Sequence, residues 1–160
     1  MYYIFGISIE GLVIIILPLI INIFYALFPP KTAEKEGQHK VSILEILEQV
    51  SRYLMLLSFW ILLSSDKSRN LVFMLIAVAF LVFYYIVWIR YFIKGREQKW
   101  LKASFCFVLI PLAIFPVLYF LFASLSLNNY IIAAISGFFG ICHCLLTSKK
   151  FVWLKRVVLK

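Results

Sequence analysis

Charged residues are scarce in this chain. Only 14% of its 160 residues are charged and seven are acidic, whereas about a quarter of the residues in soluble globular domains are charged. The mean hydropathy is +1.01, and 64% of the residues are hydrophobic. These values exclude a soluble catalytic domain and indicate a chain whose apolar segments lie in a membrane.

The residues that build catalytic and metal sites are also few. The sequence has two histidines, and it lacks an HExxH motif, a phosphate-binding glycine loop, a serine nucleophile elbow and a dinucleotide fingerprint. Polytopic membrane enzymes usually bring several acids or histidines together from different helices, and the sequence does not show such a set. We therefore expect no cofactor, and we favour a non-enzymatic function.

Cysteine is equally rare. The three cysteines provide no even framework for disulfides, and the expected topology places all of them near the reducing face. Cys142 and Cys144 flank His143, but on a helix they diverge by about 200°. With Cys106, these residues are a secondary candidate for a soft-metal site, and buried small apolar side chains are the favoured interpretation.

Long apolar runs dominate what remains. Each is close to the length of about 20 residues that a helix needs to cross a bilayer. The predicted spans are 3–28, 41–63, 71–93, 103–125 and 130–146, followed by a basic interfacial tail over 147–160. The sequence therefore predicts an all-α polytopic transmembrane bundle of five spans in a single domain, residues 1–160.

Proline interrupts two of these spans. Pro18 has no N–H, so the carbonyl of Ile14 loses its helical partner and must be satisfied by a neighbouring group in the hydrocarbon. Pro111 and Pro116 should bend the fourth span.

Basic residues are distributed asymmetrically around the predicted spans. Only Lys67 and Arg69 lie on the side of the N-terminus, and the other fourteen of the 16 Lys and Arg residues lie on the opposite side. This predicts an outside N-terminus and a cytoplasmic C-terminus in a bacterial cytoplasmic membrane, with no nucleic-acid partner. The positions expected to contact anionic headgroups on the cytoplasmic face are Lys94, Arg96, Lys99, Lys102, Lys149, Lys150, Lys155 and Arg156.

The second span begins with a polar face. Glu45, Glu48, Gln49 and Arg52 fall within an arc of about 100° on a helix. Glu48 and Arg52 stand four residues apart in the favourable order for an ion pair. The face is our candidate functional site, and the entry of a helix at the membrane interface is the structural alternative.

Two polar residues interrupt the first span. Glu10 lies near the outer boundary, within reach of Lys67 or Arg69, and its functional alternative is a proton or cation site. Asn22 lies deeper, where an interhelical hydrogen bond is favoured over a ligand role.

Parts of the first two spans resemble a family of small multi-span membrane proteins of Gram-positive bacteria. The similar residues are Pro18, Asn22, Phe28-Pro29-Pro30-Lys31, Leu44-Glu45 and Leu47-Glu48-Gln49-Val50-Ser51-Arg52. The chain departs from that pattern at Val50-Ser51, where the family has Ile-Gly. The resemblance implies no activity, because none is assigned to the family.

Three functional hypotheses follow. The leading one is an accessory or scaffolding subunit, or a factor that binds lipid and a partner, which is another membrane protein or a second copy of the chain. The second is a small transporter or channel subunit with a polar path formed by Glu10, Asn22, Glu45, Glu48 and Arg52. The third is a membrane enzyme that acts on lipid at the inner face through Glu45, Glu48 and His143.

Overall fold

The computed structural model describes residues 2–31, 41–66, 68–105 and 107–158. Within these residues it contains six helices and two short strands. In chain order they are β1 (Tyr3–Phe5), α1 (Ile9–Leu27), α2 (Ile43–Ile61), β2 (Leu62–Ser64), α3 (Leu71–Ile93), α4 (Gln98–Lys102), α5 (Pro111–Ser126) and α6 (Tyr130–Val158). The predicted all-α class is confirmed, with one small two-stranded sheet added to it.

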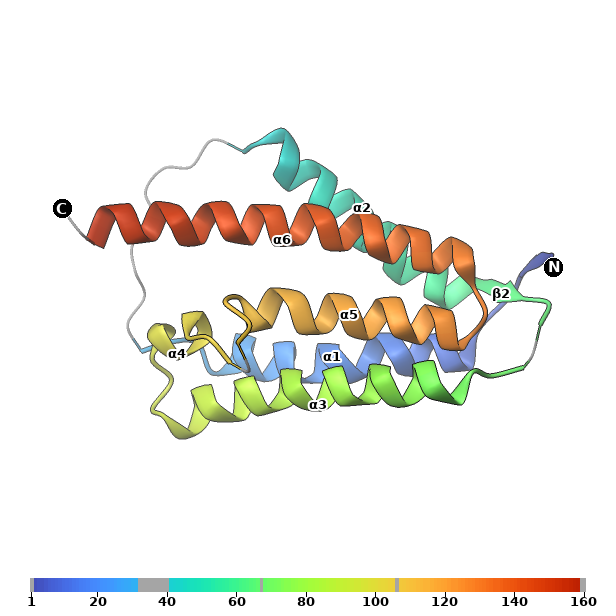
Figure 1. The fold of residues 1–160 in the computed structure, drawn as a ribbon, viewed down its shortest axis with the longest axis horizontal. Coiled ribbons are helices and arrows are strands. Elements are labelled where there is room, and N and C mark those ends of the chain that lie inside the picture. The colour runs from blue at the N-terminus through green and yellow to red at the C-terminus, as the bar shows by residue number, and fades with distance from the viewer. Residues whose placement is uncertain (1, 32–40, 67, 106, 159–160) are drawn as a thin grey trace.

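Helices α1, α3, α5 and α6 run roughly along the long axis of the molecule, and α2 crosses it obliquely (Figure 1). Helices α1, α3 and α5 lie together, and α2 and α6 cover one side of them. Helix α5 packs against both α3 and α6, while α2 packs mainly against α6 and α1. The hairpin end of the bundle holds residues 3–8, 62–66, 68–70 and 127–129, and the opposite basic end holds residues 28–31 and 94–104.

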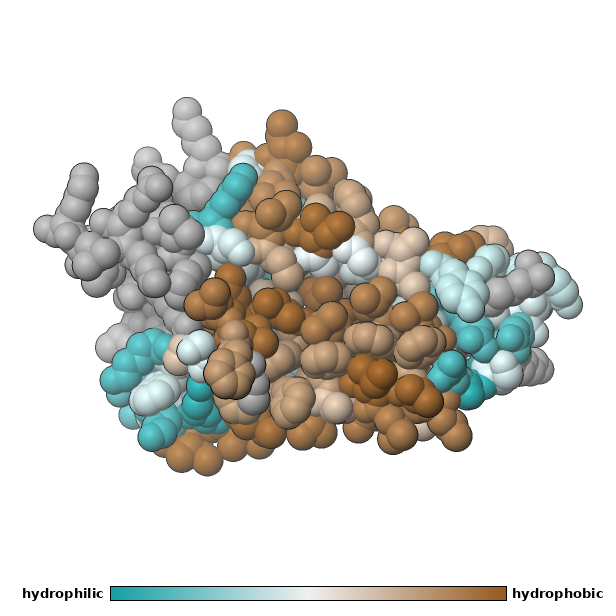
Figure 2. Space-filling model, in the orientation of Figure 1, coloured by the Kyte–Doolittle hydropathy of each residue, from teal (hydrophilic) through white to brown (hydrophobic). Residues whose placement is uncertain are grey.

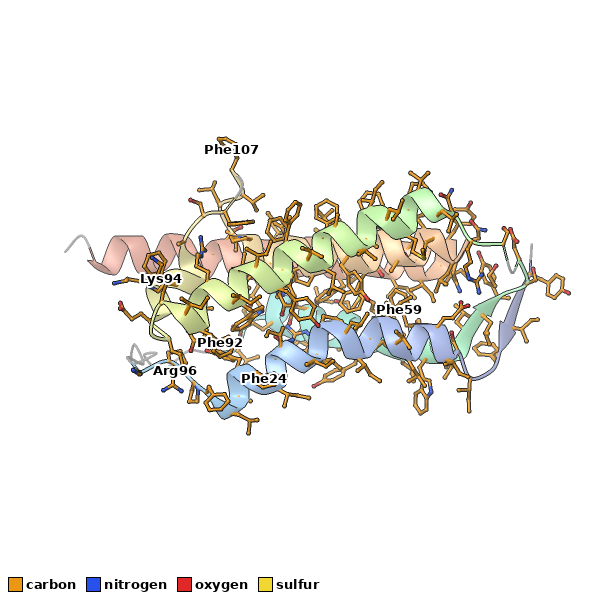
Figure 3. All side chains as sticks on the ribbon, turned by 90° about the horizontal axis from the view of Figure 1, so that it is seen from below. Phe24, Phe59, Phe92, Lys94, Arg96 and Phe107 are labelled. Atoms are coloured by element: carbon orange, nitrogen blue, oxygen red, sulfur yellow. The ribbon has the colours of Figure 1, made fainter. Side chains whose placement is uncertain are left out.

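Aromatic and branched side chains fill the space between the helices. Phe59 of α2 and Phe120 of α5 are both buried, and their ring centroids lie 5.7 Å apart. Phe59 lies toward the middle of the bundle in Figure 3, whereas Phe107 projects away from it. The core between the described helices is therefore mainly apolar.

The outside of the bundle is also apolar. Figure 2 shows a broad hydrophobic zone across the middle of one face, with hydrophilic residues gathered at both ends. Among the described residues, three helices are long and apolar enough to cross a membrane: Ile9–Leu27, Leu71–Ile93 and Tyr130–Lys149. These features agree with a membrane protein. The count of five crossings stays a prediction, because α5 has only 16 residues and α2 carries three charged side chains.

The first predicted span is wrong at its start. Residues Tyr3–Phe5 form β1, which pairs antiparallel with β2 so that Ile4 lies opposite Leu63. Helix α1 begins only at Ile9, because the hydroxyl of Ser8 accepts a hydrogen bond of 2.9 Å from the N–H of Gly11 and caps it. The same pairing ends the second predicted span early, at Ile61.

The fourth predicted span is also wrong at its start. Pro111 is the first residue of α5 and does not bend a longer helix. Proline suits this position because the first helical N–H needs no partner, and its ring disfavours helical geometry at Ile110. The preceding residues include a tight turn with a bridge between Phe105 and Val108. Pro116 lies inside α5, as predicted.

Candidate functional site

The start of α2 is set by a capping box. The hydroxyl of Ser42 accepts a hydrogen bond from the N–H of Glu45, and the Glu45 carboxylate accepts one from the N–H of Ser42 at 3.0 Å. This reciprocal arrangement satisfies two N–H groups that the first turn would leave unpaired. Glu45 therefore has a structural role as a cap, and Glu48 follows it on the face that meets α6.

Among the described residues, Glu48 is the buried acid. Only 1% of it is exposed. Its Oε1 atom forms an ion pair with Arg52 and lies 2.8 Å from Nδ1 of His143 on α6. A buried carboxylate without a cation or a hydrogen-bond donor would be strongly destabilising. The contact therefore explains how α2 carries an acid into a helix interface.

Phe139 orders the two groups that contact Glu48. Its ring stacks on the imidazole of His143, with centroids 5.2 Å apart and an interplanar angle of 24°. The guanidinium carbon of Arg52 lies 5.9 Å from the centroid of the same ring. We call Glu48, Arg52, Phe139 and His143 the α2–α6 cluster.

The chemistry of the cluster follows from its protonation. A carboxylate accepts hydrogen bonds, so the tautomer of His143 that suits this contact carries its hydrogen on Nδ1. The charges of Glu48 and Arg52 offset each other, and a neutral imidazole keeps the buried cluster free of net charge. In that form Nε2 of His143 is an acceptor.

The cluster is open on one side. The side chain of His143 is 22% exposed and that of Arg52 is 38% exposed. No described residue bonds to Nε2 of His143 or to the remaining guanidinium nitrogens of Arg52. The exposed side of the cluster therefore carries hydrogen-bonding groups unused by the described residues, namely Nε2 of His143 and the remaining N–H groups of Arg52.

The structure divides the polar face that the sequence predicts. Gln49 is exposed, Glu45 caps the helix, and only Glu48 and Arg52 join the cluster. Phe139 was not predicted from the sequence. Phe139 and His143 are four residues apart, so both lie on one face of a helix. This spacing is the sequence signal from which their contact could have been predicted.

The cysteine-rich stretch does not form a metal site among the described residues. No group of three His, Cys, Asp or Glu residues comes together in that part of the chain. Cys142 is buried and Cys144 is half-buried, both with free thiols. Cys106 lies outside the described residues.

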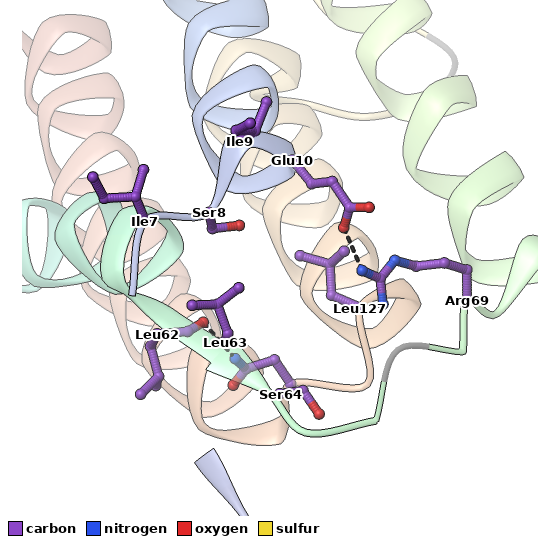
Figure 4. A pocket seen from close by; sticks show the side chains of 10 residues that line it. Ile7, Ser8, Ile9, Glu10, Leu62, Leu63, Ser64, Arg69 and Leu127 are labelled. Atoms are coloured by element: carbon purple, nitrogen blue, oxygen red, sulfur yellow. Dashed lines mark hydrogen bonds and ion pairs between the residues drawn. The ribbon is translucent and has the colours of Figure 1, made fainter. Parts of the chain in front are cut away.

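Glu10 and Asn22 take part in separate contacts. Glu10 forms an ion pair of 2.5 Å with Arg69 beside a cleft of about 320 Å³ at the hairpin end (Figure 4). Asn22 accepts a hydrogen bond of 2.8 Å from the hydroxyl of Tyr84 and so joins α1 to α3. Glu48 lies between α2 and α6. Within one chain, Glu10, Asn22 and Glu48 therefore take part in three different contacts.

At the basic end, cations lie over aromatic rings. The Nζ atom of Lys94 lies 5.0 Å from the ring centroid of Trp100, and the guanidinium carbon of Arg96 lies 5.7 Å from that of Phe28. Figure 3 shows Lys94 and Arg96 at this end. Amphipathic aromatic rings and basic side chains are typical of the level of lipid headgroups.

The stretch that follows these cations in the chain is held by Arg90 of α3. Its guanidinium group donates hydrogen bonds of 2.9–3.1 Å to carbonyl oxygens in the stretch 100–104, namely those of Trp100, Ala103 and Ser104. The short helix α4 is thereby fixed against the end of α3.

Three of the predicted headgroup contacts have no anionic partner among the described residues. Lys99 forms an ion pair of 2.5 Å with Glu97, whereas Lys94, Arg96 and the exposed Lys149 pair with no described acid. The side chains of Lys102, Lys150, Lys155 and Arg156 lie outside the described part of the structure.

No family model, curated protein or solved structure matches this chain.

Proposed function

We propose that this chain is a small multi-pass membrane protein of the non-enzymatic type that binds anionic lipid headgroups through its basic end. The observation that carries the proposal is the position of Lys94 and Arg96. Both lie at one end of an apolar bundle, beside aromatic rings and without a described acidic partner. Within this role, the protein serves as an accessory or scaffolding subunit.

The distribution of charge supports the choice of this end. At the hairpin end, Arg69 is neutralised by Glu10. At the basic end, cations remain available, and each Lys or Arg near an anionic leaflet contributes about 1 kcal/mol of attraction. The basic end is therefore the cytoplasmic one in this proposal, with the hairpin end outside.

The lipid-binding part is tested in nanodiscs of phosphatidylcholine, with or without phosphatidylmethanol, an anionic lipid. We expect the anionic lipid to raise the thermal unfolding midpoint of the wild-type protein. The double variant Lys94→Gln with Arg96→Gln should lose most of this rise, and added salt should reduce it in the wild type, because ions screen exposed charges.

Lys99→Gln is the matched control, because Lys99 lies over the same Trp100 ring, with its Nζ atom 5.6 Å from the centroid, but is already paired with Glu97. The Lys99→Gln variant should retain the rise in thermal unfolding midpoint that the anionic lipid produces. An equal midpoint in the two lipid compositions would contradict the proposal.

The accessory role is tested by native mass spectrometry of the protein released from its own membrane. A second polypeptide in fixed stoichiometry with the 18.7 kDa chain is the expected result. A mass made up only of copies of the chain and lipid would remove the accessory role and leave the lipid-binding role in place.

A further inference from the structure

The α2–α6 cluster has hydrogen-bonding capacity that no described residue uses. In the neutral tautomer that donates to Glu48 from Nδ1, Nε2 of His143 is an acceptor without a described partner, and Arg52 uses one guanidinium nitrogen to bond Glu48. Polar groups without partners are costly in an apolar environment. Both side chains are partly exposed, so a group from outside the protein can reach them.

The depth of the cluster identifies that group. His143 lies six residues before the exposed Lys149 on α6, which corresponds to about 9 Å along the helix axis. Each polar layer of a bilayer is about 5–8 Å thick. With Lys149 at the aqueous boundary of the basic end, the cluster lies at the inner edge of the headgroup layer, where the glycerol and phosphate groups of lipids are found.

We infer that the α2–α6 cluster is a binding site for the headgroup of an anionic lipid that carries free hydroxyl groups, a polyol phosphodiester. Arg52 donates to the phosphate oxygens, the recognition for which guanidinium geometry is suited. Nε2 of His143 accepts a hydrogen bond from a headgroup hydroxyl. Glu48 and Phe139 bind no lipid and position these two groups.

The chemistry of the site distinguishes headgroup classes. A choline headgroup has no hydrogen-bond donor for Nε2 of His143. An ethanolamine headgroup has donors, but its ammonium would lie near the like charge of Arg52, which is unfavourable. A methyl phosphodiester satisfies Arg52 alone. A glycerol phosphodiester satisfies both groups.

This inference rests on the proposed lipid-binding function but concerns a different site from the basic end. Lys94 and Arg96 respond to negative charge, whichever headgroup carries it. The α2–α6 cluster also responds to hydroxyl groups at constant charge. One pair of probes therefore separates the two, namely phosphatidylglycerol and phosphatidylmethanol with identical acyl chains.

The experiment measures how tightly the purified full-length protein retains each lipid, by native mass spectrometry of lipid-exchanged micelles. Phosphatidylglycerol should be retained about two- to tenfold more tightly than phosphatidylmethanol by the wild type, the factor expected for one added hydrogen bond. His143→Phe keeps the stacking on Phe139 and should remove this difference. Lys94→Gln should weaken both lipids equally and preserve it.

Several results would overturn the inference. Equal retention of the two anionic lipids by the wild type would do so, and this comparison stands even if His143→Phe does not fold. If both were nevertheless retained better than phosphatidylcholine, the basic-end proposal would survive alone. If neither were, both would fail. Displacement of phosphatidylglycerol by soluble glycerol 3-phosphate at similar concentration would overturn a lipid as the ligand.

Discussion

The hydroxyl of Tyr119 on α5 donates a hydrogen bond of 2.9 Å to the carbonyl oxygen of Ile14 on α1. This carbonyl is the one that Pro18 leaves without a helical N–H donor. The sequence predicted that a neighbouring group would satisfy it, and the structure confirms this. In a hydrocarbon environment the bond both removes an unpaired polar group and ties α1 to α5.

Tyr119→Phe should therefore destabilise the protein. Interhelical hydrogen bonds in membranes contribute about 0.5–2 kcal/mol, and the loss should fall in this range in an unfolding titration with denaturing detergent. In the background of Pro18→Ala, which restores the N–H partner of Ile14, the same substitution should be less damaging. A loss of equal size in both backgrounds would contradict the assigned role.

Tyr130→Phe is the control for this cycle. Tyr130 is exposed and makes no hydrogen bond with a described residue through its hydroxyl. Its substitution should change stability by less than about 0.5 kcal/mol, as is usual for surface positions.

Gly11 marks a second close approach of α1, this time to α2. A Cβ atom at this position would lie 1.7 Å from the carbonyl oxygen of Phe59. Gly11→Ala must move backbone and should destabilise the protein by about 1–3 kcal/mol or more. At Gly137 of α6 a Cβ atom would meet no neighbouring residue of the described chain within 4 Å, so Gly137→Ala should be neutral or stabilising by about 0.5–1 kcal/mol. Equal losses of stability for Gly11→Ala and Gly137→Ala in the detergent titration would contradict the close packing of α1 against α2.

The orientation of α6 provides a test of topology. Leu127 lies at the hairpin end, and α6 then leads toward the basic end. Reporters fused after Leu127 and after Lys160 should lie on opposite sides of the membrane, with the C-terminal reporter in the cytoplasm. Reporters on the same side would show that α6 does not cross and would remove the five-span topology.

The turn that leads into α3 should respond to acid. Hydrogen bonds from the side chain and backbone of Ser68 hold the pKa of the exposed Asp66 carboxyl below its ordinary value. Because the folded-state pKa is lowered, the stabilisation is present above the ordinary value of about 4 and is lost as the pH falls through the lower, folded value. The Ser68→Ala variant should raise the titration midpoint of the Asp66 carboxylate band in infrared spectra, with Asp66→Asn identifying the band. An unchanged midpoint would rule out this hydrogen bond.

Features that depend on neighbours along the chain could be predicted. The long apolar runs determined the helical class and the membrane environment, since hydrocarbon requires each segment to satisfy its own backbone hydrogen bonds. The missing N–H of Pro18 determined that the Ile14 carbonyl needs an outside donor. The spacing of Glu48 and Arg52 determined their ion pair, because residues four apart are adjacent on a helix.

The tertiary structure decided which faces meet. Glu48 and His143 are 95 residues apart, and periodicity on α2 and α6 shows the direction of each side chain without showing which helix lies opposite. The same holds for Tyr119 as the donor to Ile14 and for the pairing of β1 with β2. These contacts depend on how the apolar surfaces of all the helices pack at once, and local sequence does not encode that arrangement.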